Sequence, residues 1–312
     1  ALADVPYLAI DLRATASTPV MSPDVMARLA ALPCPSIALV TPGAAVDPFR
    51  AALDVVVEGE EDLRAVVAGI VAAPQAAAML AQVLRASATL DVAAGLAVES
   101  MAYAALQAGP EHARWLRGRG ASDPAPQSDE PAVRIARGGK DLVVTLARPA
   151  RHNAFSARMR DELAAALGLA IVEPGCAVVL RGDGPSFCSG GDLDEFGTRS
   201  DPATAHLIRT TRSPARLLAE VGPRTRADLH GACIGAGIEL AAYAATVVAR
   251  PDAFIQLPEV AMGLIPGAGG TVSLPRRIGR QRTAMLALSG RRLDATTARE
   301  WGLVDRVEAA PV

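Results

Sequence analysis

Apolar residues recur at helical spacing in the first third of the chain. Three stretches there are rich in alanine and leucine with apolar positions three or four apart, the period of an amphipathic helix. They are residues 60–73, 74–88 and 93–107. Before them, two short strand-like runs at 7–12 and 36–40 lie on either side of a helical pattern at 23–32. We therefore expect a mainly helical N-terminal module.

The pattern changes after a segment that is typical of a linker. Residues 120–131 hold three prolines among small and polar residues, a composition that suits a connection and no regular element. We therefore divide the chain into an N-terminal module at 1–125, a linker at 126–131 and a second domain at 132–312.

In the second domain, strand-like runs alternate with helical ones. Strands are expected at residues 132–136, 141–146, 177–180, 226–229, 246–249, 253–256 and 303–307. Helices are expected at residues 156–169, 203–220, 235–245, 281–289 and 294–301, with Ser156 as the cap of the first. Pairs of strands separated by a helix recur, which predicts an α/β fold with a repeated ββα unit.

Composition narrows the class of protein. Of the 312 residues, 51% are hydrophobic and 3% aromatic, so the core must be packed with alanine, valine and leucine. The formal net charge is −2, which argues against a general nucleic-acid-binding protein. The second half is more basic, with 23 basic and 18 acidic residues at 131–312 against 8 and 15 at 1–130. A phosphorylated ligand would suit that charge, but scattered surface arginines are the commoner explanation.

The cysteines and the apolar runs indicate where in the cell the protein is expected. The four cysteines are Cys34, Cys176, Cys188 and Cys233. They have no zinc-site spacing and are too few for a disulfide framework, so we expect buried thiols in a reducing compartment. Residues 1–6 lack the basic and apolar regions of a signal peptide. Residues 231–249 are apolar, but Glu239 and three early glycines favour a buried helix over a membrane span. We expect a soluble, cytoplasmic protein without a membrane partner.

Two glutamates are the main candidates for chemistry. Glu239 is the only charge in the apolar run 231–249, and Glu259 follows Pro258 just before the glycine-rich residues 263–271. A carboxylate in apolar surroundings has a raised pKa, which brings it into the range useful for proton transfer. Two such groups beside one substrate could divide the acid and base work between them.

Four segments surround these glutamates with glycine-rich turns. Residues 148–155 (RPARHNAF) lead from a strand to a helix, and residues 186–193 (SFCSGGDL) form a loop after a strand. Residues 230–240 (HGACIGAGIEL) form a strand-to-helix turn, and residues 256–271 (QLPEVAMGLIPGAGGT) carry the second glutamate. In this order and spacing, they closely resemble the enoyl-CoA hydratase/isomerase family, the crotonase superfamily, over about residues 132–307.

The resemblance implies a crotonase-like spiral core of ββα repeats and an oxyanion hole for a thioester carbonyl. Matched motif by motif, the hole would use the backbone N–H groups of Gly191 and Ala236, where the family often has glycine at the second position. Two preorganised donors would hold the charge that develops on the oxygen, each worth roughly 3–4 kcal/mol. The donor near a helix N-terminus would also benefit from the helix dipole.

The resemblance further implies roles for the two glutamates and for the substrate-binding residues. Glu239 would deprotonate a water that attacks C3 of a trans-2-enoyl-CoA, and Glu259 would deliver a proton to C2. Keeping both glutamates points to an enoyl-CoA hydratase of fatty acid metabolism. The residues expected to bind the acyl-CoA are Arg148, Arg151, Ala154, Ser189, Gly190, Asp192, Leu193 and Gly235. No metal or cofactor is expected beyond the CoA of the substrate, and a homo-oligomer, a trimer or a multiple of it, is the family norm.

Each of these residues also has a structural interpretation. Glu239 could pair with a buried arginine and Glu259 could be an exposed loop acid, while Arg148 and Arg151 could be ordinary surface charges. Cys188, Cys233 and the histidines His152 and His230 suit turn or core roles better than catalysis. Two other functions stay open. One is isomerisation or another thioester-enolate reaction on the same fold. The other is a non-catalytic acyl-CoA-binding or assembly subunit.

The chain departs from the family pattern at both ends of the matched region. Members usually continue past the equivalent of Val307 with a helical segment that covers the site and helps to build trimers, but the sequence stops at Val312. The helical runs at 60–73, 74–88 and 93–107 resemble that segment placed first. We therefore interpret residues 1–125 as the degenerate back half of a second crotonase unit. An unrelated alanine-rich helical appendage is the alternative.

Overall fold

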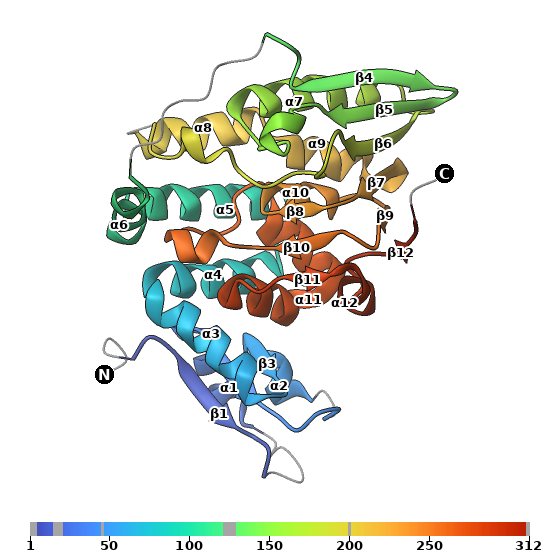
Figure 1. Cartoon of the computed structure of the whole chain (residues 1–312). Helices are drawn as coiled ribbons and strands as arrows, with labels where there is room; N and C mark the ends of the chain where they lie inside the picture. The colour runs from blue at the N-terminus through green and yellow to red at the C-terminus, as the bar shows by residue number, and fades with distance from the viewer. Residues whose placement is uncertain (1–4, 15–20, 45–46, 121–128, 199–200, 310–312) are drawn as a thin grey trace.

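The structure is a computed structural model, and it describes residues 5–14, 21–44, 47–120, 129–198 and 201–309. The helical N-terminal module lies along one side of the sheet-containing second domain (Figure 1). Residues 126–128 of the predicted linker at 126–131 lie outside the described residues.

A six-stranded sheet forms the frame of the second domain. Its strands in spatial order are β12 (Arg306–Val307), β9 (Thr246–Ala249), β7 (Thr225–Leu229), β6 (Ala177–Gly182), β5 (Asp141–Leu146) and β4 (Val133–Gly138). In this sheet only β4 runs antiparallel to its neighbour, β5, with which it forms a hairpin. A smaller sheet has the order β11 (Leu293–Asp294), β10 (Phe254–Gln256) and β8 (Ala232–Ile234). The mixed α/β architecture confirms the predicted crotonase-like fold class.

Six helices connect and cover these strands. They are α7 (Ala157–Val172), α8 (Pro202–Thr211), α9 (Pro214–Val221), α10 (Ala236–Ala241), α11 (Gly270–Ser289) and α12 (Ala295–Glu300). The Ser156 hydroxyl caps α7 by accepting a hydrogen bond from the Met159 N–H, as predicted. The prediction of one helix at 203–220 is wrong. Pro214 ends the first helix because it cannot continue the hydrogen-bond ladder, and Ser213 caps a second.

The N-terminal module combines a small parallel sheet with four successive helices. Its strands are β1 (Leu8–Asp11), β2 (Ser36–Leu39) and β3 (Val55–Val57), in that spatial order. The short helices α1 (Pro23–Ala30) and α2 (Pro48–Ala52) lie between them in the sequence. The four that follow are α3 (Glu60–Ala72), α4 (Pro74–Ser87), α5 (Val92–Gln107) and α6 (Pro110–Arg119). The strands and helices predicted in this module are therefore confirmed, while α2, β3 and α6 were not expected.

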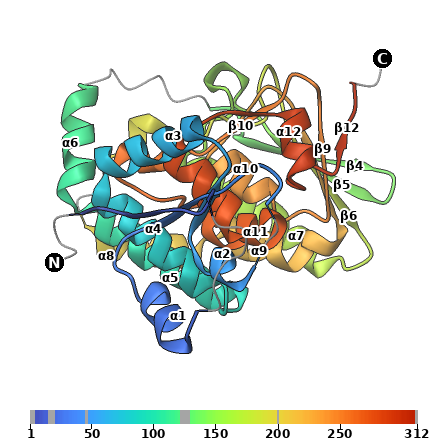
Figure 2. The ribbon, with the colours of Figure 1, turned by 90° about the horizontal axis from the view of Figure 1, so that it is seen from below.

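The module packs closely against the second domain. Helices α3, α4 and α5 contact α11, and α5 also contacts α8 and α9 (Figures 1 and 2). At Gly69 of α3 the backbones nearly touch, because a Cβ added there would lie 1.8 Å from the Leu288 carbonyl oxygen of α11. One continuous apolar core contains residues of both parts, such as Leu80 and Leu286.

A buried ion cluster joins the same two parts. The Asp54 carboxylate, 1% exposed, accepts hydrogen bonds from Arg85 of α4 and Arg280 of α11. The hypothesis that residues 1–125 are the degenerate back half of a second crotonase unit requires helices at 60–118 that contact residues 131–312, and both conditions are met. Strands β1, β2 and β3 are parallel neighbours in chain order, and a helix precedes β2. Strands β6, β7 and β9 of the second domain have the same arrangement, with helices before β7. The evolutionary interpretation itself stays a prediction.

The described helices were also compared with the dimensions of a bilayer. None of them alone is long and apolar enough to span a membrane, although the pair α3 and α4, bent by 111°, would pass by length and composition only.

Candidate active site

Glu239 lies on α10, inside the protein. Gly235, with φ of 48°, turns the chain from β8 into the helix, so Glu239 falls on its first turns. The residue is 2% exposed. Its Oε2 accepts hydrogen bonds from the Ala268 N–H at 2.7 Å and from the Gly270 N–H at 2.8 Å. Burial raises the pKa of Glu239 well above its usual value, the charges of Glu259 and Glu99 raise it further, and the two amides oppose the shift.

Glu259 lies across the cavity on a short 3-10 helix, Glu259–Met262. Its Oε2 atom is buried and has no hydrogen-bond partner among the described residues. Burial, with a contribution from the charge of Glu99, raises the pKa of Glu259 to about 8. A buried carboxyl oxygen without a donor favours the protonated form. The two glutamates therefore differ, because Glu239 accepts hydrogen bonds from two amides of another segment, whereas the amide that lowers the pKa of Glu259 is its own.

A third buried carboxylate, Glu99 of α5, comes from the N-terminal module. It accepts hydrogen bonds from the Gly269 N–H at 2.7 Å and from the Thr271 N–H and hydroxyl at 2.8 and 2.7 Å. Burial raises its pKa to about 7. Because α5 is remote in sequence from these glycines, no local motif indicated that Glu99 would join the site.

The two glycine-rich loops meet beside the glutamates. A Cβ added to Gly235 would lie 3.6 Å from the Gly190 Cα and 2.4 Å from Glu259 Oε1, so only glycine permits this approach. The N–H groups of Gly191 and Ala236, the predicted oxyanion donors, donate no hydrogen bond to other described residues. Ala236 is the first residue of α10, where the amide has no partner within the helix. The geometry therefore leaves both N–H groups available to an acceptor.

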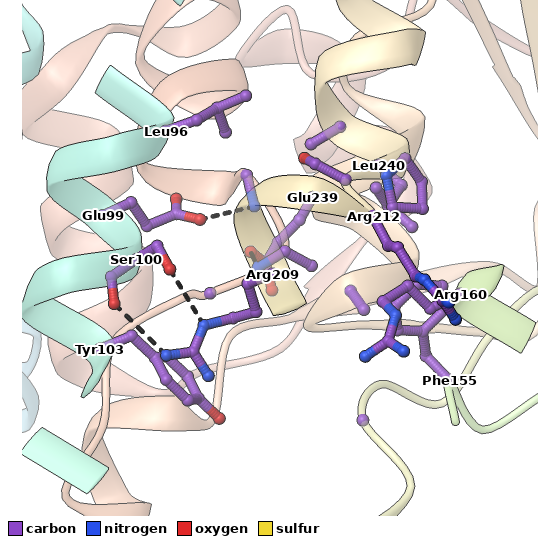
Figure 3. A pocket seen from close by; sticks show the side chains of 18 of the residues that line it. Leu96, Glu99, Ser100, Tyr103, Phe155, Arg160, Arg209, Arg212, Glu239 and Leu240 are labelled. Carbon is purple, nitrogen blue, oxygen red and sulfur yellow. Dashed lines mark hydrogen bonds between the residues drawn. The ribbon is translucent and has the colours of Figure 1, made fainter. Parts of the chain in front are cut away.

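These groups line one cavity of about 350 Å³. The predicted residues on its wall are Gly191, Asp192, Ala236, Glu239 and Glu259. The opposite wall comes from α5 and the α8–α9 segment, with Glu99, Tyr103 and Arg209 (Figure 3). The N-terminal module thus supplies part of the pocket, which the sequence left undecided.

The other predicted binding residues do not line the cavity. Arg148 and Arg151 both pair with the Asp192 carboxylate, at 2.9 and 3.1 Å, and Arg151 also pairs with Asp194 at 2.5 Å. These arginines are absent from the cavity lining, and so are Ala154, Ser189, Gly190, Leu193 and Gly235. The Ser189 N–H donates to the His152 carbonyl oxygen, and the Ala154 carbonyl oxygen accepts from Arg148. Their role in binding CoA stays a prediction.

The thiols and histidines have structural surroundings. Burial raises the pKa of Cys188 to about 12 and also raises that of Cys233, which keeps both thiols protonated and unreactive. His152 contacts the Ser186 hydroxyl through Nδ1 at 3.0 Å, and His230 contacts the Gly184 carbonyl through Nε2 at 2.9 Å. Both histidines fasten turns around the loop 186–193.

Comparisons with known proteins agree with this geometry. Residues 140–311 match the family described as enoyl-CoA hydratase/isomerase. The chain is similar to the 2,3-dehydroadipyl-CoA hydratase of Escherichia coli, with 36% identity over 55% of this chain and 68% of that protein. The chain spans about half to two thirds of the length of the curated relatives that it matches.

Solved structures give the same result. The enoyl-CoA hydratase of Thermoplasma volcanium aligns with a TM-score of 0.53 and 36% identity, over 57% of this chain and 72% of that one. A structure from Thermobifida fusca in complex with CoA aligns with a TM-score of 0.51 and 32% identity, over 58% and 73% of the two chains.

Proposed function

This chain belongs to the enoyl-CoA hydratase/isomerase family, and we propose that within it the protein is a hydratase acting on trans-2-enoyl-CoA thioesters. The observation that carries the proposal is the pair Glu239 and Glu259. Both carboxyl groups line one cavity, Glu239 buried and Glu259 half-buried, and only Glu239 accepts hydrogen bonds from the Ala268 and Gly270 amides. This asymmetry suits one ionised and one protonated group, as the addition of water requires.

The hydrogen bonds assign a role to each glutamate. Burial raises the pKa of both, but the Ala268 and Gly270 amides favour the anion on Glu239 when the pair shares one proton. Glu239 therefore accepts a proton from the attacking water while the water oxygen bonds to C3. Glu259, kept protonated by burial, donates its proton to C2. The double bond then becomes a single bond carrying one hydroxyl and one hydrogen. A proton moving from Glu239 to Glu259 restores the starting state.

The thioester oxygen is stabilised by the two loop amides. As water adds at C3, electrons move through the conjugated system and charge accumulates on that oxygen. The free N–H groups of Gly191 and Ala236 would hold it, each contributing roughly 3–4 kcal/mol to the transition state. Because the donors are backbone groups, the alanine at position 236 is no obstacle. Its N–H begins α10, whose dipole adds to the effect.

The test is hydration of crotonyl-CoA, followed by loss of the conjugated enoyl-thioester absorbance. Glu239→Gln and Glu259→Gln should each abolish turnover while crotonyl-CoA still binds. Glu111→Gln is the matched control, because Glu111 is also buried but caps α4 through the Gln75 and Ala76 amides, away from the cavity lining. Glutamine variants that keep full hydratase activity would contradict the proposal.

Two other results would favour the alternative functions, an isomerase or a non-catalytic subunit. Movement of a double bond in a 3-enoyl-CoA that survives Glu239→Gln but not Glu259→Gln would indicate an isomerase. Binding of acyl-CoA without turnover of either substrate would indicate a non-catalytic subunit.

A further inference from the structure

Arg209 of α8 carries a positive charge into the wall of the cavity. Its guanidinium lies over the Tyr103 ring, 4.6 Å from the ring centre, and both residues line the cavity. Figure 3 shows the Arg209 side chain reaching Ser100 and Tyr103 of α5, on the same cavity as Glu239. None of the roles proposed above uses this arginine.

The partners of Arg209 are all uncharged. Nε donates to the Ser100 hydroxyl at 3.1 Å, Nη2 to the Ser100 carbonyl oxygen at 3.4 Å, and Nη1 to the Gln107 side-chain oxygen at 3.4 Å. A guanidinium has five N–H donors. Two donors are thus left over, and two of the three bonds made are long.

No carboxylate among the described residues lies within ion-pair distance of Arg209. The other arginines of the cavity wall either have a carboxylate partner or are exposed to solvent. Arg160 and Arg212 share the Asp161 carboxylate, and Arg216 is exposed. Glu99, the nearest acid on α5, is already bonded to the Gly269 and Thr271 amides.

A partly buried cation with only neutral partners is costly unless an anion accompanies it. Burial indeed lowers the pKa of Arg209. The tyrosine ring beneath the guanidinium offsets some of the cost, but it leaves donors unused. An anionic group of the ligand would both supply the missing charge and accept these donors.

We propose that Arg209 binds a carboxylate on the acyl chain, so that the preferred substrates are 2-enoyl-CoA thioesters with a terminal carboxylate. The inference rests on the proposed function, because it takes the thioester to be held between Gly191, Ala236 and the two glutamates. Two spare N–H donors on one planar group suit the two oxygens of a carboxylate.

The position of Arg209 favours the acyl chain over the phosphates of CoA as the source of the anion. Arg209 lies on the wall made by α5 and α8, among Tyr103, Ser100 and Gln107. The arginines predicted to meet CoA, Arg148 and Arg151, belong to the loop on the opposite side and do not line this cavity. A single half-buried guanidinium also matches one carboxylate better than a diphosphate.

The experiment compares pairs of thioesters that differ only at the end of the acyl chain. Hexanoyl-CoA and adipoyl-CoA, both saturated, are titrated into the full chain by calorimetry, with succinyl-CoA and suberoyl-CoA added to cover chain length. Hydration of trans-2-hexenoyl-CoA and trans-2-hexenedioyl-CoA gives the corresponding values of kcat/KM. The variants are Arg209→Met and Arg209→Lys, with Arg212→Met as an arginine of the same wall that already has a carboxylate partner.

We expect at least one diacid thioester to bind tenfold or more tightly than hexanoyl-CoA. Arg209→Met should weaken that binding ten- to hundredfold and change hexanoyl-CoA less than threefold, while Arg209→Lys restores part of the difference. Arg212→Met should leave the ratio of the two substrates unchanged. The same ratios in kcat/KM would support the inference further.

Two results would overturn the inference. One is a wild-type protein that binds hexanoyl-CoA as well as every diacid thioester. The other is an Arg209→Met variant that loses all thioesters and free CoA equally, which would assign the arginine to CoA. If neither enoyl substrate is hydrated but adipoyl-CoA binding still depends on Arg209, the inference stands and only the proposed hydratase function fails.

Discussion

Glu99 and Glu239 accept hydrogen bonds from alternate amides of one four-residue stretch. Ala268 and Gly270 donate to Glu239, while Gly269 and Thr271 donate to Glu99. This stretch leads into α11, so the helix N-terminus helps to stabilise two carboxylates. One comes from the second domain and the other from the N-terminal module. The backbone that orients the proposed base is therefore fixed from both sides.

Replacing Glu99 with glutamine should lower kcat about tenfold and leave KM nearly unchanged. Glutamine keeps the shape but loses a charge-assisted hydrogen bond to the 269–271 backbone, worth about 1.5 kcal/mol or more. The charge of Glu99 also raises the pKa of Glu239 and of Glu259. Without it, both limbs of the pH profile of kcat/KM should move to lower pH, by about 0.5 to 1 unit.

The pH shift separates a role at the site from a purely structural one. Glu111→Gln removes the charge of another buried, helix-capping glutamate of the same module, and it should leave the profile in place. A Glu99→Gln protein with reduced kcat but an unmoved profile would show that Glu99 only supports the fold.

The wild-type pH profile should be bell-shaped. Glu239 and Glu259 titrate as a pair, and the active form carries one proton between them. Since burial raises the pKa of Glu259 to about 8, kcat/KM should fall above about pH 8 as the second proton leaves. It should fall again on the acid side, where Glu239 becomes protonated, and because burial raises the pKa of Glu239 this limb should lie above the usual range of a glutamate. A profile that stays flat from pH 6 to 10 would rule out Glu259 as the acid.

Much of this site could be predicted from the sequence because its signals are local. A buried glutamate in an apolar run, glycines at tight turns and a proline before Glu259 are visible over a few residues. Most helices and strands could be predicted for the same reason, because hydrophobic spacing is visible over a few residues, but their boundaries were less accurate. Helix α11 begins at Gly270, ahead of the expected residue 281, because its glycines and Pro275 disguise the first turns, and Gly279 at φ 81° bends it.

What the sequence could not show is convergence over long separations. Glu99 reaches Gly269 across 170 positions, and Arg209 meets Ser100 across 109. In α5, Glu99 and Tyr103 are one turn apart on a helix that is apolar nearly all round. Such spacing is equally typical of core residues. Only the packing of α5 against α8 and α11 gives these side chains a site.

Glu259→Gln should stabilise the protein, increasingly so as the pH rises. A carboxyl whose pKa is higher in the folded than in the unfolded state binds more protons when folded. Wild-type stability therefore falls between about pH 4.5 and pH 8. The neutral amide escapes this loss, so the free energy of unfolding should exceed that of wild type by about 1–3 kcal/mol at pH 8, with little difference at pH 4.5.

Urea unfolding at several pH values measures the effect. Glu61→Gln, at an exposed glutamate of α3, controls for the loss of one negative charge from the whole molecule. An unfolding difference that is constant across the pH range would show that Glu259 is not held protonated by its surroundings.

Asp54→Asn should destabilise the contact between module and second domain by about 3–5 kcal/mol. Asp54 is buried and pairs with Arg85 and Arg280, so the change leaves two guanidinium groups without their charge partner. Asp62→Asn is the control. Asp62 also pairs across the two parts, with Arg291 at 2.6 Å, but both side chains are about one third exposed and should contribute less than about 1 kcal/mol. Equal losses in urea unfolding would refute this distinction.

Gly235→Ala should reduce hydratase activity about a hundredfold or more. The residue has φ of 48°, and the added Cβ would lie 2.4 Å from Glu259 Oε1, so the proposed acid would be displaced. Gly139→Ala shares the backbone strain, with φ of 67° in the β4–β5 turn, but its Cβ would meet nothing within 4 Å. Gly139→Ala should lose about 1 kcal/mol of stability because alanine resists positive φ, and Gly235→Ala should lose more because its Cβ also collides with Glu259. Only the first should lose turnover of crotonyl-CoA, and similar activities in the two variants would mean that close packing at Gly235 does not position Glu259.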